Sequence, residues 1–156
     1  MTEKESTFLV THAEDESAVV SDVHGGQVHT LSSNPGLDVD EVLEGTVTAD
    51  PPMEVTWSVT DVVERKTIPV EAADERPTPQ AFEMAEALSE GELATTERAG
   101  VGEVHVLAVP SENVEAAVAD VLDDQATLER AARIGIDRVE VRSSVEDGFV
   151  SVRYLP

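Results

Sequence analysis

Short segments rich in β-forming residues, one of them with apolar and polar positions in clear alternation, recur through the first seventy residues and predict a series of short strands. In residues 53–63 the alternation is clearest, because Met53, Val55 and Trp57 are separated by polar neighbours. A period of two places one face of a strand inward and the other outward. The same criteria predict strands over 7–13, 17–23, 28–33 and 42–48, with a short edge strand over 67–70.

Turn residues lie between these segments and support hairpin connections. Residues 24–27 contain paired glycines, and residues 34–36 contain Pro followed by Gly, both of which are typical of tight turns. Five or six short strands at this spacing indicate an N-terminal small β-barrel over residues 1–71, of the oligonucleotide-binding or SH3-like kind.

The last third of the chain, residues 103–156, follows a different pattern and predicts a compact β-α-α-β-β unit. Its first helix carries an amphipathic stripe that includes Val114, Val118 and Val121. Its second helix ends before Gly135, a residue type that accepts the left-handed conformation at a helix terminus. The expected elements are a strand over 103–109, a helix from 110, a helix over 125–134, and strands over 137–143 and 148–154.

Residues 72–102 are expected to link these two parts. Thr78 is a suitable N-cap and Pro79 a suitable first residue for one helix over 80–89. Residues 90–102 contain glycines and no clear period, so an irregular segment is expected there. The predicted fold class is therefore α+β, with a barrel, a linker that contains one helix, and a C-terminal unit.

The net charge of the chain is its most unusual property. The 156 residues include 33 Asp and Glu against 10 Lys and Arg, a formal net charge of −23. A chain this acidic is often disordered, but 40% hydrophobic residues in periodic positions can form a core. Concentrated salt screens repulsion between surface carboxylates, since the Debye length falls to roughly 3 Å at 1 M. We therefore expect a cytoplasmic protein of an extremely halophilic organism; a specialised acidic protein of an ordinary cell is the alternative.

The sequence has no cysteine, which excludes disulfides, thiol chemistry and cysteine-based zinc sites. Its polar N-terminus and short apolar runs predict neither a secretory leader nor a membrane span. Both observations favour the cytoplasm as its location.

Histidines are the first candidates for chemistry, and three of them fall in the predicted barrel. His12, His24 and His29 are weak candidates for a metal site, because none has helical ligand spacing or a known ligand motif. Half-buried strand positions are the alternative for His12 and His29. No nucleophile motif, dinucleotide loop, phosphate-binding loop or calcium loop is complete, so we expect no cofactor and favour a non-enzymatic role.

Positive charge is concentrated near the C-terminus. Residues 1–129 carry 5 basic and 29 acidic residues, net −24, whereas residues 130–156 carry 5 basic and 4 acidic residues, net +1. In the last two predicted strands, valines that face the core would place the alternating arginines on the outer face. A planar guanidinium suits phosphate or carboxylate recognition, which gives five candidate binding residues: Arg130, Arg133, Arg138, Arg142 and Arg153. The alternative is that they pair with Glu129, Glu140 and other carboxylates of the same chain.

Three segments resemble a known group of sequences. TFLVTHA at 7–13, VHTLSSNPG at 28–36 and PPMEVTW at 51–57 resemble an uncharacterised family of small halophilic archaeal proteins. The resemblance extends over nearly the whole chain. It implies the source class, and it supplies no activity and no catalytic residues.

Three hypotheses for function remain open. The first is a non-enzymatic binding or adaptor protein in cytoplasmic protein or ribonucleoprotein complexes, acting through the arginine-bearing hairpin. The second is a barrel that binds nucleic acid, although the barrel half is acidic and its Trp57 is in phase with core valines. The third is an enzyme that uses the barrel histidines.

Overall fold

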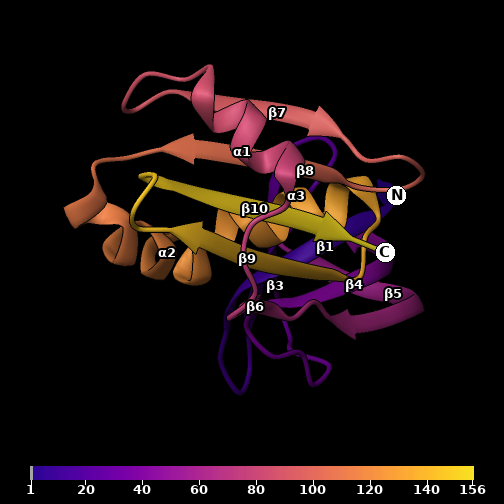
Figure 1. Ribbon diagram of the computed structural model, residues 1–156. Helices are drawn as coiled ribbons and strands as arrows, with labels where there is room; N and C mark the ends of the chain where they lie inside the picture. The colour runs from indigo at the N-terminus through magenta and orange to yellow at the C-terminus, as the bar shows by residue number, and fades with distance from the viewer. Residues whose placement is uncertain (1) are drawn as a thin grey trace. The chain divides into compact units, whose positions relative to one another are not determined.

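The computed structural model describes residues 2–156 and has a mixed α+β fold built mostly of strands, with three α-helices among the described residues (Figure 1). Two compact units can be distinguished. The first extends to Ile68 and includes Leu128–Arg133, and the second comprises Pro69–Thr127 and Ile134–Pro156. The boundaries 1–71, 72–102 and 103–156 remain predictions from the sequence.

Five strands of the first unit form a closed ring in the order β1-β2-β3-β5-β4. Strand β1 pairs with both β2 and β4 in antiparallel register, and β2 with β3 and β4 with β5 pair in the same way. One parallel pairing, Leu31 with Trp57, joins β3 to β5. The strands are β1 (Glu3–Ala13), β2 (Ala18–Asp22), β3 (Val28–Leu31), β4 (Glu41–Ala49) and β5 (Trp57–Thr67). Each strand predicted within residues 7–63 has a counterpart in this ring.

Alternating side chains of these strands fill the ring with an apolar core. Its buried members include Phe8, Val20 and Leu43, and Trp57 and Val59 pack against them with part of their surface exposed. Burial of this kind contributes roughly 25 cal/mol per Å² of apolar surface removed from water. Of the residues that the alternation over 53–63 assigned to the inward face, Trp57 packs against this core.

The start of the fifth strand differs from the prediction. The strand expected over 53–63 begins at Trp57, and Met53 and Val55 are 75% and 71% exposed. The Asp50 carboxylate accepts hydrogen bonds from the hydroxyls of Thr56 and Ser58, and the Asp50 amide donates to the carbonyl of Thr56. These contacts close a turn over residues that alternate in sequence but lie outside the sheet.

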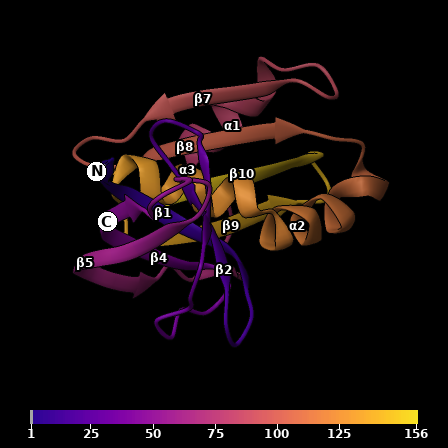
Figure 2. The ribbon, with the colours of Figure 1, turned by 180° about the vertical axis from the view of Figure 1, so that it is seen from behind.

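The second unit contains a five-stranded sheet in the order β6-β9-β10-β8-β7 (Figures 1 and 2). Its strands are β6 (Val70–Ala72), β7 (Leu93–Glu97), β8 (Glu103–Ala108), β9 (Arg138–Ser144) and β10 (Phe149–Leu155). Two expectations are corrected here. The edge strand predicted at 67–70 lies at Val70–Ala72 and pairs in parallel with β9, and the segment expected to be irregular at 90–102 contains β7.

Helix α1 (Pro79–Glu86) confirms the helix expected after Thr78, whose hydroxyl accepts a hydrogen bond from the Ala81 amide at 3.3 Å. It covers one sheet face through contacts of Ala81 and Phe82 with Val104, Val106 and Phe149. Alternate residues, including Val139 and Val141, are buried on the opposite face.

The other two helices are α2 (Val114–Asp123), which packs against β9 and β10, and α3 (Gln125–Ile134). The bounds of α3 are those predicted, and Gly135 follows it with a φ of 73°. The elements β8, α2, α3, β9 and β10 follow one another along the chain, while Leu128–Arg133 of α3 belong to the first unit. Within residues 2–156, no helix combines the length and apolar character needed to cross a membrane.

Replacing Gly45 by alanine is expected to destabilise the ring. The β4–β5 ladder shifts register beside Gly45, and a Cβ atom there would lie 2.2 Å from the backbone oxygen of Asp61. We expect Gly45→Ala to lower the free energy of unfolding by about 3 kcal/mol or more, measured by denaturant titration. The control is Gly36→Ala, where φ is +96° but no atom lies within 4 Å, and the expected loss is about 1 kcal/mol. Equal losses in the two variants would contradict the close approach.

Candidate functional site

The arginine-bearing hairpin of β9 and β10 has the side-chain alternation predicted from the sequence. Val139 and Val141 are buried, and Glu140 lies opposite Arg153 while Arg142 lies opposite Ser151. Residues opposite one another in an antiparallel pair share a face, so Glu140, Arg142 and Arg153 lie together on the face opposite Val139 and Val141. The register of β10 with β8 places Val104 and Val106, and therefore α1, on that same face, so the expectation of an open outer face is corrected.

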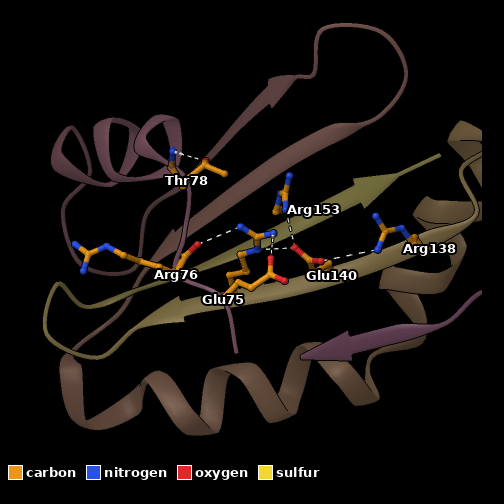
Figure 3. Close-up of polar contacts among 8 residues, drawn as sticks. Glu75, Arg76, Thr78, Arg138, Glu140 and Arg153 are labelled. Carbon is orange, nitrogen blue, oxygen red and sulfur yellow. Dashed lines mark hydrogen bonds and ion pairs between the residues drawn. The ribbon is translucent and has the colours of Figure 1, made fainter. Parts of the chain in front are cut away.

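Glu140 is the centre of this charged group (Figure 3). Its Oε1 accepts hydrogen bonds from Arg142 Nε at 2.5 Å and from Arg153 Nη1 at 2.6 Å. Arg138 Nη1 lies 3.9 Å from its other carboxylate oxygen. Burial alone would raise the pKa of Glu140, but the hydrogen bonds and charges of Arg142 and Arg153 outweigh burial and hold the pKa below its ordinary value of 4.5. Glu140 is therefore an ionised acceptor for several guanidinium groups.

Arg142 also links the sheet to the segment that precedes α1. Its Nη2 donates to Glu75 Oε2 at 2.6 Å and its Nη1 donates to the backbone oxygen of Arg76 at 3.1 Å (Figure 3). The Ala73 amide donates to the Val141 carbonyl on the same strand. The Arg142 side chain is only 13% exposed, and its contacts chiefly connect β9 to the segment before α1.

The remaining candidate arginines lie in the first compact unit. Arg133 donates from Nε to the Val23 carbonyl at 2.8 Å and from Nη2 to Glu129 Oε1 at 3.2 Å. Arg130 lies on the same segment and also has an interaction partner. The five candidates thus divide between two units. Arg133 pairs with Glu129, and Arg142 and Arg153 pair with Glu140, as the alternative of pairing within the chain predicted. A role for these arginines in binding a second molecule stays a prediction.

His29 is buried in the interior of the ring. Its imidazole makes edge contacts with the Phe8 ring at 5.7 Å and with the Trp57 ring at 4.5 Å between centroids. Neither ring nitrogen has a hydrogen-bond partner within residues 2–156. Burial, with a smaller contribution from Lys4, lowers the pKa of His29 and outweighs the opposing charge of Asp22. The imidazole is therefore a neutral core group.

The three histidines considered as metal ligands are not brought together. His12 lies opposite Val19 and His29 lies opposite Val20, and neighbouring residues of a strand point to opposite faces. His12 is accordingly exposed, His29 is buried, and His24 lies in an exposed turn. No group of three or more His, Asp or Glu side chains suited to a metal ion occurs in the described part of the chain.

The structure reveals one polar pair that the sequence did not single out. His105 Nε2 lies 2.9 Å from Glu103 Oε1, and the His105 ring is 4.9 Å from that of Tyr154. The pair could have been found from the sequence, because Glu103 and His105 are two residues apart in a predicted strand and therefore lie on one face. Glu103 also lines an open hollow of about 210 Å³ with Glu97, Gly100, Gly102 and Ile134. The His105 ring therefore has a carboxylate as its hydrogen-bond partner on this face of the sheet.

The loops over residues 13–15 and 34–39 line an open acidic hollow of about 440 Å³. Asn34 builds it by donating to the backbone oxygens of Glu14 and Leu37 and accepting from the amides of Gly36 and Leu37. Its charged lining consists of carboxylates: Glu14, Asp15 and Asp38. This hollow suits a cationic group better than a phosphate.

The hairpin of β4 and β5 exposes apolar side chains from both its loop and its second strand. Besides Met53 and Val55 in the loop, Val62 and Val63 of β5 are 47% and 63% exposed. Scattered exposed apolar residues are common, but one methionine and three valines on one hairpin mark a candidate interaction surface. We call residues 51–56 together with β4 and β5 the β4–β5 hairpin.

Replacing Glu140 by glutamine is expected to weaken the fold and alter its dependence on pH. The folded-state pKa of Glu140 lies below the unfolded value, so its contribution is complete above pH 4.5 and is lost as pH falls through the folded value. Glu140→Gln should lower the free energy of unfolding by about 2 kcal/mol at pH 7, with the difference shrinking below about pH 4.5. The exposed Glu146→Gln in the same hairpin serves as the control. Equal stability of the two variants from pH 7 to pH 3 would rule out the central role of Glu140.

Comparison with known proteins identifies one family. No curated protein and no solved structure matches the chain. A family of unknown function does match it, as the resemblance to an uncharacterised family led us to expect, and the match extends over residues 4–143. This protein therefore belongs to the family of unknown function DUF5812.

Proposed function

We propose that this protein is a non-enzymatic binding module that engages a protein partner through the β4–β5 hairpin of its ring. The observation that carries the proposal is the exposure of Met53, Val55, Val62 and Val63 on that one hairpin. Exposure of large apolar side chains to water is unfavourable in free energy, and burial in an interface with another protein relieves it.

The topology of the ring supports a barrel of the oligonucleotide-binding kind. The order β1-β2-β3-β5-β4, with β1 shared between two neighbours and a parallel contact between β3 and β5, agrees with that architecture. Such barrels bind ligands through the face of strands 2 and 3 and through the loops after strands 1 and 4. Loop 50–56 of this chain, which exposes Met53 and Val55, follows strand 4.

The surface chemistry of the ring argues against nucleic acid as its ligand. Single strands are bound by positively charged grooves and by exposed aromatic rings on which bases stack. Here Phe8 is fully buried, and Trp57 packs on the core against His29. The loop after strand 1 carries Glu14, Asp15 and Glu16, which would repel a phosphate backbone. A protein partner suits this surface better.

We also propose that the protein works in the cytoplasm of a halophilic cell. Its net charge of −23 requires screening, and concentrated salt supplies it. Under those conditions exposed apolar surface is disfavoured further, which strengthens the interpretation of the β4–β5 hairpin as a contact surface.

The proposed function is tested by capture of the tagged full-length protein from the cells that produce it, lysed in roughly 3 M KCl to preserve screening. One sample is treated with ribonuclease and deoxyribonuclease, and one is not. We expect the same proteins to be retained in both samples. Loss of every partner after nuclease treatment, or recovery of the protein alone, would overturn the proposal.

Two surface variants locate the contact. Met53→Ser combined with Val55→Ser should abolish retention of the partners, because it removes apolar contacts from the loop. The matched control is Val145→Ser, another half-exposed valine in a turn of the second unit, which should retain them. Equal retention by both variants would show that the β4–β5 hairpin is not the contact surface.

A further inference from the structure

The β4–β5 hairpin carries a group of carboxylates among its exposed valines. Glu44 lies directly opposite Glu64 in the ladder, and Asp61 lies opposite Thr46, two residues along on the same face. Like charges placed directly opposite one another in a sheet are destabilising. None of the three carboxylates has a basic partner within residues 2–156. A cation placed between Glu44 and Glu64 would relieve this repulsion.

The basic side chains nearest in sequence are committed to other contacts. Arg65 donates from Nε and Nη2 to the two carboxylate oxygens of Glu41, at 2.7 and 2.8 Å, and from Nη2 to the Gly36 carbonyl. Lys66 also has an interaction partner. The negative charge of Glu44, Asp61 and Glu64 is therefore available to a second molecule.

One edge of β5 is open to such a molecule. Beyond the single pairing of Trp57 with Leu31, residues 58–67 have a strand neighbour on the β4 side alone, within the part of the chain described. Residues 60–65 are exposed along this edge. An extended segment lying there would contact Val62 and Val63 and reach the three carboxylates with alternate side chains.

A second copy of this chain is a poor occupant of the edge. A second copy would present the same carboxylates, so its charge would oppose the association.

We infer that the β4–β5 hairpin binds an extended segment of a partner protein in which basic residues alternate with apolar ones. Charge complementarity selects this occupant: valines and a methionine meet the apolar residues, and Glu44, Asp61 and Glu64 meet lysine or arginine. In concentrated salt these ion pairs act at contact distance, while the apolar contacts supply most of the affinity. The inference rests on the proposed function and specifies the chemistry of the partner.

The inference is tested with a synthetic, dye-labelled peptide of alternating lysine and valine, titrated with the full-length protein in roughly 1 M and 3 M KCl. Fluorescence anisotropy measures the dissociation constant. We expect saturable binding that weakens at least about tenfold in the double variant Glu44→Lys, Glu64→Lys. The charge-matched control is Glu146→Lys combined with Glu90→Lys, two exposed positions of the second unit, which should bind like the unaltered protein. A peptide of alternating glutamate and valine should not bind.

Two results would overturn the inference. If both charge-reversed variants weakened binding of the lysine peptide equally, the peptide would be attracted by the net charge of the protein and not by the β4–β5 hairpin. If the glutamate peptide bound as tightly as the lysine peptide, the hairpin would not select basic residues. Circular dichroism of each variant in the same salt verifies that the ring is folded. Loss of captured partners after nuclease treatment would instead contradict the proposed function. Partners that depend on Met53 and Val55 but not on Glu44 and Glu64 would contradict this inference alone.

Discussion

The scarcity of positive charge is the constraint on which the rest of this structure depends. The chain has ten basic residues and 33 acidic residues. Several of the basic side chains connect segments that are far apart in the sequence. Lys4 holds Asp22 at 2.7 Å, Arg65 holds Glu41, and Arg142 holds both Glu140 and Glu75. The Lys4–Asp22 and Arg142–Glu140 pairs are largely shielded from water, and charge-assisted hydrogen bonds contribute more there than in exposed pairs such as Arg142–Glu75.

The Asp22 contact illustrates how a buried carboxylate is accommodated in this chain. Burial opposes its ionisation, but hydrogen bonds from Lys4, from Ser6 and from the backbone amides of His24 and Gly25 outweigh burial. The pKa of Asp22 therefore lies well below its usual range. Carboxylates without such partners, among them Glu44 and Glu64, are exposed at the surface.

Local patterns allowed much of the fold to be predicted from the sequence. The cap at Thr78, the bounds of α3 and the burial of Val139 and Val141 all follow from local spacing, which was interpreted correctly. Long-range pairing was beyond those patterns. Nothing local indicates that residues 70–72 pair with β9, or that β7 lies at the edge of the same sheet. Local alternation also predicted a strand that includes Met53 and Val55, but the hydrogen bonds of Asp50 with Thr56 and Ser58 place these two residues in a turn.

The candidate site follows the same rule. Alternation placed Arg138, Arg142 and Arg153 on one face, but their partners depend on tertiary structure, since Glu75 lies 67 residues before Arg142. The sequence also did not single out the β4–β5 hairpin, because the exposure of Met53 and Val55 reverses what their period suggests. Sequence patterns thus identified elements and faces, while the available surfaces depended on how those elements pair.

The dependence of stability on salt tests the central claim about charge most directly. Thermal unfolding of the protein is followed by circular dichroism in KCl from roughly 0.1 M to 3 M, with sucrose as a control for general solvent exclusion. We expect Tm to rise steeply with KCl and the protein to be unfolded at the lowest concentration, because repulsion among unpaired carboxylates is then unscreened. A Tm that is unchanged across this range would contradict it.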